Sequence, residues 1–133
     1  MSESYQAALA RSAQIEERLV EDPAQFRMLT GDRPTGALHV GHFFGSIQNR
    51  VRLQRAGAEI MQLIADYQVI TDRESVGEIQ ANVHNLVLDN IAAGLDPERA
   101  TYFTHSSVPA LNQLLLPFLS LVSVAELQRN PTV

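Results

Sequence analysis

Two histidines, His39 and His42, stand three residues apart in a glycine-rich segment of this 133-residue chain. An apolar run precedes the segment and an amphipathic stretch follows it, which predicts a strand, a glycine turn and the start of a helix. The first backbone N–H groups of a helix are unpaired and carry the positive end of its dipole, which favours a phosphate group. Side chains three apart on a helix share a face, so both imidazoles can point at one anion.

Three glycines, Gly31, Gly36 and Gly41, allow the backbone of this segment to bend and to approach a ligand closely. The pattern therefore predicts a phosphate site at the start of a helix. Two other interpretations stay open at this point. The histidines could only cap the helix, or they could bind zinc, since the His-x-x-His spacing suits a helix, although the sequence offers no obvious third ligand.

Composition limits the classes of protein to which the chain can belong. At 45% hydrophobic residues it is expected to form one compact domain with a core. It has no apolar run of bilayer length and no basic-then-apolar leader, so a cytoplasmic location and no membrane partner are expected. The absence of cysteine excludes disulfides and thiolate chemistry. The net charge of −5 argues against a broad nucleic-acid surface, and all ten Lys or Arg positions are arginine.

Hydrophobic periodicity predicts an alternation of helices and strands. A helix over 4–20 has a narrow apolar stripe and is expected to pack on the outside of the domain, ending at Asp22-Pro23. The strand over 58–65 is expected to be buried on both faces. The other predicted strands cover 25–30 and 101–104, and the other predicted helices cover 40–56, with Phe44, Ile47 and Val51 in register, and 79–91.

The end of the chain carries further helix signals. Ser107 can start a helix through 110–116, Pro117 kinks or breaks it, and Ser123 and Glu126 have the spacing of a capping box. The order of elements predicts an α/β fold, the first half of a doubly wound parallel-sheet nucleotide-binding domain of the HUP or Rossmann-like type, preceded by an N-terminal helix.

Several segments together resemble the tryptophanyl-tRNA synthetases, a family of class I aminoacyl-tRNA synthetases. The string from Gly31 to His42 reads Gly-x-x-Pro-Thr-Gly-x-Leu-His-x-Gly-His, and its end has the form of the class I signature. The segment 64–71 resembles the end of that family's second strand. Further similar segments are 92–98, which contains Gly-Leu-Asp-Pro-Glu, 106–110, which contains Ser-x-Val-Pro-Ala, and 124–129.

The resemblance implies a tryptophan–tRNA ligase, which activates tryptophan with ATP to tryptophanyl-adenylate and transfers it to tRNA(Trp). This chain would supply the ATP-binding half, with ATP bound as its Mg²⁺ complex, no tightly bound cofactor, no metal site and a homodimeric assembly. Residues 25–133 would be the N-terminal half of the catalytic domain, truncated, and 1–24 a helical extension. The chain alone is therefore expected to be inactive or very weakly active.

The resemblance also assigns individual residues to the nucleotide. His39 occupies the first signature position, at the phosphates, and His42 occupies the last. Both would act in catalysis as hydrogen-bond donors or cations, not as general bases, because charge on the phosphates grows toward the transition state. The residues implied to bind ATP are Arg33, Pro34, Thr35, Gly41 and His42.

The amino-acid pocket is implied to be bordered by Leu29, Gly31 and Gln68. His105 ends the third predicted strand and points toward the same edge. Asp66 ends the second predicted strand, where it could either meet a ligand or cap a turn. In the family's sheet the first strand lies centrally, so here the strand over 25–30 is expected to leave one edge unpaired.

Some alternatives remain open from the sequence. Three arginines near the end of the 40–56 helix could interact with the helix end and solvent or contact tRNA phosphates; they are Arg50, Arg52 and Arg55. A nucleotidylyltransferase shares the strand, turn and histidine signature, although 29–36 does not match its usual opening. A synthetase-like module that binds nucleotide or a partner protein without catalysis is the non-enzymatic alternative.

Overall fold

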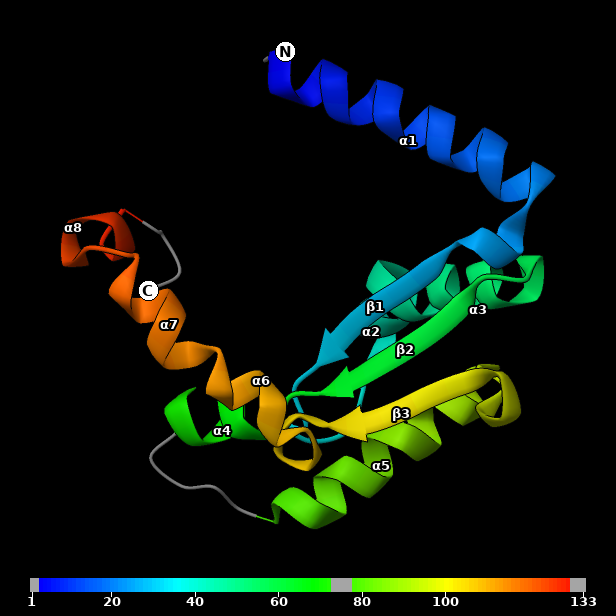
Figure 1. Ribbon diagram of the computed structural model, residues 1–133. Coiled ribbons are helices and arrows are strands. Elements are labelled where there is room, and N and C mark those ends of the chain that lie inside the picture. Colours follow the sequence, from blue (N-terminus) through cyan, green and yellow to red (C-terminus); the bar gives the residue numbers. More distant parts are fainter. Residues whose placement is uncertain (1–2, 73–77, 130–133) are drawn as a thin grey trace.

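Three parallel strands form one sheet in the order β1-β2-β3 (Figure 1). The computed structural model describes residues 3–72 and 78–129. Strand β1 pairs in parallel with β2, and β2 pairs in parallel with β3, which confirms the predicted α/β class. Because the strands are parallel, their carboxyl ends meet at one edge of the sheet. The strands are β1 (Arg27–Asp32), β2 (Glu59–Ile64) and β3 (Ala100–Thr104).

Helices on one face of the sheet connect the strands. A continuous helical segment links β1 to β2 and comprises α2 (Val40–His42), a π-helical turn η2 (Phe43–Ile47) and α3 (Gln48–Ala56). Between β2 and β3 lie α4 (Asp66–Asp72), which the sequence did not predict, and α5 (Ile79–Ala92). A hydrogen bond between Arg50 of α3 and Asn90 of α5 places both crossover helices on the same face.

The core lies between this face and the helices. Its buried cluster joins Ile47 and Val51 to Ile60 at the centre of β2 and to Leu95 just after α5. Burial along β2 alternates, with Ile60, Gln62 and Ile64 buried and the intervening side chains only half-buried. The prediction that this strand is buried on both faces is therefore wrong, because both crossovers cover the same side.

The helix after the glycine turn begins at Val40 and ends at Ala56, as predicted, but its register is not regular. The π-helical turn holds one more residue than an α-helical turn would, which rotates the side chains before it. Phe44, predicted on the buried side, is 66% exposed, and Phe43 packs against the core in its place. Gly57 ends the helix with φ +114°, a conformation that glycine adopts without strain.

The first helix, α1 (Glu3–Glu21), extends away from the sheet (Figure 1). Among its described side chains only Leu19, in the last turn, is buried, so the prediction that its apolar stripe packs on the domain is wrong over most of its length. Two hydrogen bonds of 3.0 and 2.7 Å from Arg52 to Glu16 connect it to α3. The turn η1 (Pro23–Gln25) follows, so β1 starts two residues later than predicted and includes Gly31.

The end of the described chain is helical and exposed. Pro117 would crowd the carbonyl of Gln113, four residues earlier, and α6 (Pro109–Gln113) ends at that residue before α7 (Leu115–Ser120) begins. Val108, not Ser107, occupies the N-cap position of α6, and its side chain makes no capping hydrogen bond. The predicted capping box is confirmed at α8 (Val124–Leu127): Ser123 N–H donates to Glu126 at 2.8 Å, and the bonds from Ser123 lower the pKa of that carboxyl. Short 3₁₀ turns, η3 (Pro97–Arg99) and η4 (His105–Ser107), flank β3.

No helix in the described ranges is long and apolar enough to cross a membrane.

Gln54 of α3 should be a strong contributor to stability, because its buried amide pairs with both backbone groups of Asp96. Its Nε2 donates to Asp96 O at 2.9 Å, and its Oε1 accepts from Asp96 N–H at 2.8 Å. Gln54→Leu leaves two partly buried backbone groups without these partners and is expected to lower the free energy of unfolding by about 2–4 kcal/mol. Urea denaturation measures the change. Gln48→Leu, at an exposed site of the same helix, is the matched control and should change stability by less than about 0.5 kcal/mol; an equal loss in both variants would contradict the assignment.

Candidate functional site

The segment between β1 and α2, residues 33–39, forms a loop at the carboxyl edge of the sheet; we call it the glycine loop. Gly36 within it has φ +131°, a conformation that residues with a Cβ rarely adopt, so the turn requires glycine there. The loop also has an internal backbone hydrogen bond of 2.9 Å from Thr35 N–H to Arg33 O. The glycine turn predicted from the sequence is thus present and leads directly into the helix.

The two signature histidines meet at the start of that helix. His39 is the N-cap residue, with extended backbone (φ −124°, ψ 172°), and its Nδ1 accepts from Gly41 N–H at 3.1 Å. Reciprocally, His42 Nδ1 accepts from His39 N–H at 3.2 Å. The ring centroids lie 4.0 Å apart. The histidines therefore cap the helix, and they also stand together on one side of it.

This capping determines which ring atoms are available to a ligand. A neutral imidazole whose Nδ1 accepts a hydrogen bond carries its proton on Nε2, so both rings present an Nε2–H donor. The N–H of Gly41 already has a partner, the Nδ1 atom of His39. An anion at this helix start would therefore meet two ring donors first, and would compete with His39 for the backbone N–H of Gly41.

Gly41 is the residue that makes room for the His39 ring. A Cβ added at Gly41 would lie 2.9 Å from Cε1 and 3.0 Å from Nδ1 of His39, so close that the ring would have to shift. Glycine is needed here because the ring folds over the first turn of the helix. The His-x-Gly-His spacing thus has a local steric cause.

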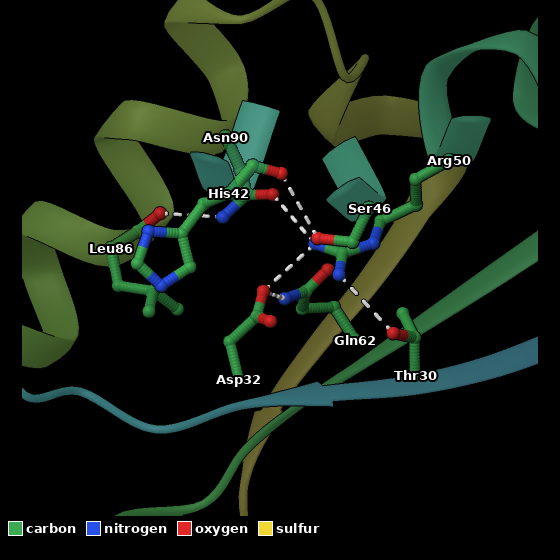
Figure 2. Close-up of polar contacts among 8 residues, drawn as sticks. All are labelled: Thr30, Asp32, His42, Ser46, Arg50, Gln62, Leu86 and Asn90. Carbon is green, nitrogen blue, oxygen red and sulfur yellow. Dashed lines mark hydrogen bonds and ion pairs between the residues drawn. The ribbon is translucent and has the colours of Figure 1, made fainter. Parts of the chain in front are cut away.

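A buried polar cluster centred on Arg50 lies at the end of β1, where the glycine loop begins (Figure 2). The Arg50 side chain is fully buried, and its Nη1 donates to Asp32 Oδ2 and to Asn90 Oδ1, each at 2.9 Å. Its Nη2 donates to Thr30 Oγ1 at 3.2 Å, and Gln62 Nε2 donates to Asp32 at 2.6 Å. Because a buried charge needs partners, these oxygens hold the end of β1 in one position.

Some buried polar atoms in and beside this cluster have no hydrogen-bond partner from the protein. In the described part of the chain, Arg50 Nε, Gln62 Oε1 and the Tyr102 hydroxyl have no hydrogen-bond partner although they are buried. Gln62 and Tyr102 are register partners on β2 and β3, so their side chains share a face. Burial raises the pKa of Tyr102, and the charge of Arg50 opposes this rise.

The other end of the glycine loop is held by α5. Leu38 N–H donates to Asp89 Oδ2 at 3.0 Å, across 51 positions of sequence. A hollow of about 230 Å³ adjoins this contact and the first signature histidine. Its lining residues are Leu38, His39, Val40, Phe43, Ile47, Asp89 and Ala93.

The predicted nucleotide residues of the loop differ in exposure. Arg33 and Thr35 are exposed, whereas the Pro34 side chain is fully buried. Pro34 therefore fixes the path of the loop, and only its backbone can face a ligand.

The residues predicted to border the amino-acid pocket lie in two separate places. Leu29, which is 64% exposed, and Gly31 lie on the sheet face opposite the Arg50 cluster, because side chains alternate along β1. Gln68 lies on α4 and lines a mostly apolar hollow of about 390 Å³ that does not include those two residues. The other residues lining it are Tyr67, His105, Leu111, Asn112, Leu114, Leu115 and Phe118.

Asp66 caps the turn after β2. Its carboxylate accepts from Tyr67 N–H and Ser106 N–H, both at 3.1 Å, and makes a further short hydrogen bond with the Ser106 hydroxyl. The capping interpretation is thus confirmed, and the bond also ties the end of β2 to the end of β3. The centroids of the His105 and Tyr67 rings lie 5.1 Å apart, and both residues line the hollow that contains Gln68.

Sequence reasoning missed the polar cluster. Neither interpretation of Arg50, as a solvent-exposed helix-end cation or a tRNA contact, is correct, because the side chain is buried and paired. Arg52 pairs with Glu16 of α1 instead. One signal was available: Asn90 lies four residues after Leu86 on the buried side of α5, where a polar side chain needs a partner.

The described residues contain no group of three or more His, Cys, Asp or Glu side chains that could hold a metal ion.

Comparison with known proteins gives a consistent family. The model of the family described as tRNA synthetases class I (W and Y) matches residues 21–132. A tryptophan–tRNA ligase of Lactococcus lactis is 48% identical over 108 residues, which is 80% of this chain and 32% of the relative. A tryptophan–tRNA ligase of Streptococcus mutans is 47% identical over 108 residues, again 80% of this chain and 32% of the relative. The chain thus spans about a third of the length of these relatives.

Solved structures agree with the fold. A tryptophanyl-tRNA synthetase of Campylobacter jejuni superposes with a TM-score of 0.69 at 26% identity, covering 78% of this chain and 33% of that chain. Another structure of the same protein, with the same TM-score, is complexed with ADP and tryptophan.

Gly41→Ala should displace the His39 ring, because an added Cβ lies too close to it. The expected result is loss of the hydrogen bond from residue 41 N–H to His39 Nδ1, and with it the preference for the Nε2–H form of the ring. The ¹⁵N chemical shifts of the ring nitrogens measure this. Gly45→Ala is the matched control in the same helical segment, since an added Cβ there meets nothing within 4 Å. An unchanged His39 spectrum in Gly41→Ala would contradict the proposed steric role.

Proposed function

The chain belongs to the class I tRNA synthetases of the tryptophan and tyrosine type, and on that premise we propose that it forms the ATP-binding part of a tryptophan–tRNA ligase. In this reaction the carboxylate of tryptophan attacks the α-phosphate of ATP, pyrophosphate leaves, and the tryptophanyl group passes from the adenylate to tRNA(Trp). The single observation that carries the proposal is the pair of histidine rings at the end of the glycine loop, whose centroids lie 4.0 Å apart and whose Nδ1 atoms both accept hydrogen bonds from backbone N–H groups.

The chemistry of these donors suits phosphate groups. Negative charge on the leaving pyrophosphate grows as the bond to the α-phosphorus breaks, so fixed donors stabilise the transition state more than the ground state. Both rings are oriented in advance by hydrogen bonds through their Nδ1 atoms, which removes part of the cost of ordering them. His39 and His42 then act as donors or, when protonated, as cations.

We further propose that ATP binds as its Mg²⁺ complex. Mg²⁺ keeps much of its water and is bound largely by the phosphates in such complexes, so it needs no dedicated cage of protein ligands. Arg33, Thr35 and the backbone of the glycine loop would lie along the nucleotide, with Gly41 at the phosphates. Residues 25–133 form the half-domain, and 1–24 are an extension to it.

The amino-acid substrate is proposed from the relatives rather than from the pocket. The two relatives described above are tryptophan–tRNA ligases, and 48% identity to one of them supports tryptophan over tyrosine. Leu29, Gly31 and Gln68 are proposed to border the pocket at the carboxyl edge. We propose a cytoplasmic location, where both tRNA and ATP are present.

Two other functions named in the sequence analysis are less well supported. The family match gives no reason to prefer a nucleotidylyltransferase. A non-catalytic module would bind ATP without exchanging pyrophosphate, so an assay of tryptophan-dependent pyrophosphate exchange distinguishes such a module from a synthetase.

His42→Ala is expected to weaken ATP binding by about 1–3 kcal/mol, because it removes a preorganised donor. Isothermal titration calorimetry measures the affinity. His42→Asn should retain much of it, since an amide can accept from His39 N–H and donate to a phosphate at once. His84→Ala, at an exposed position on α5, serves as the control. Unchanged affinity in a His39→Ala, His42→Ala double variant would refute the proposed role of both rings.

We also propose that the chain associates, with a homodimer as its functional form. In the described chain β1 pairs only with β2, and the C-terminal helices expose large apolar side chains, with Leu116 and Leu121 each 77% exposed. Such surfaces recruit another chain.

Static light scattering at tens of micromolar should therefore report dimers or larger species. Replacing Leu116 and Leu121 together by Glu should shift the population toward monomer, whereas Val20→Glu on exposed α1 should not. A compact wild-type monomer that is insensitive to salt would contradict association.

A further inference from the structure

We infer that two consecutive residues of α5, Asp89 and Asn90, position the glycine loop by holding its two ends. The inference rests on the proposed function, because it concerns how the ATP-binding loop keeps its shape. Neither side chain is assigned a contact with the nucleotide, so both are positioning residues.

Asp89 holds the end of the loop next to the histidines. Its Oδ2 accepts the hydrogen bond from Leu38 N–H at 3.0 Å, and Leu38 immediately precedes the N-cap residue His39. The bond therefore fixes where the helix starts and where the His39 ring stands. It is a long-range contact, so no local turn preference can replace it.

Asn90 holds the opposite end through Arg50. The Asn90 Oδ1 accepts from Arg50 Nη1, and the same nitrogen donates to Asp32, the last residue before the loop. The amide of Asn90 is itself oriented, because its Nδ2 donates to Leu86 O at 2.8 Å one turn earlier. Asn90 and Arg50 are both fully buried, so water does not compete for these bonds.

One helix can serve both ends because consecutive side chains on a helix point about 100° apart. Asp89 reaches outward to the half-buried Leu38 backbone, and Asn90 reaches inward to the buried guanidinium. A displacement of α5 would therefore move both ends of the loop together. Holding the ends limits the conformations that ATP would otherwise have to select on binding.

The test compares two substitutions at one position. Asp89→Ala removes the acceptor for Leu38 N–H, whereas Asp89→Asn keeps an oxygen in the same place. Leu88→Ala, at the exposed neighbouring position of α5, is the control. The 133-residue chain is studied with MgATP by calorimetry, and without nucleotide by hydrogen–deuterium exchange of the amides at 35–41, after cooperative thermal unfolding of each variant is verified.

We expect Asp89→Ala to bind ATP about tenfold more weakly and the Leu38 amide to exchange about tenfold faster. Asp89→Asn should stay within about threefold of wild type in both measurements, as should Leu88→Ala. Wild-type exchange and affinity in Asp89→Ala would overturn the inference, and so would equal losses in Asp89→Ala and Asp89→Asn.

The proposed function and this inference fail in different ways. If the wild-type chain binds no ATP, the proposed function is wrong. The difference in hydrogen–deuterium exchange of the Leu38 amide between Asp89→Ala and Asp89→Asn still tests whether Asp89 positions the loop. If Asp89→Ala does not fold, the wild-type chain decides: a Leu38 amide protected from exchange supports the inference, and one that exchanges like an unstructured amide overturns it.

Discussion

The guanidinium of Arg50 is fully buried, and a charge there is stable only when several oxygens surround it. Thr30 and Asp32 supply them from β1, and Asn90 supplies one from α5. Because the guanidinium and its partners come from three elements, α3, β1 and α5, satisfying the one charge fixes a strand end against two helices. The glycine loop starts at that strand end, so its geometry depends on the same bonds.

The carboxyl edge of the sheet thus carries both the buried Arg50 cluster and the proposed phosphate site. Below the edge, Gln62 adds a second donor to Asp32, which holds that carboxylate at the start of the glycine loop. Above it, Gly41 leaves room for the His39 ring, and the Nδ1 atoms of both histidines satisfy backbone N–H groups. The helix start is therefore capped before any ligand binds, and the donors offered to a phosphate are on the rings.

Local signals in the sequence predicted the three strands along the chain, the glycine turn, the capping box at Ser123 and the end of α3 at Gly57, because each depends on neighbours only a few residues away. The Arg50 cluster could not be located in this way, since its partners lie 18 and 40 residues away. Polar side chains at Gln62 and Asn90, inside otherwise apolar elements, were the available sign of a buried network.

The central claim is that the glycine loop and the two histidine rings form a phosphate site. A titration of the ¹⁵N-labelled chain with MgATP, followed through backbone amides and histidine ring nitrogens, tests it most directly. The account predicts saturable shifts concentrated at residues 33–42, with the ring nitrogens of His39 and His42 among the largest. Saturable shifts confined to another part of the molecule, such as the hollow beside Gln80 and His84, or no shifts at millimolar ATP, would contradict it.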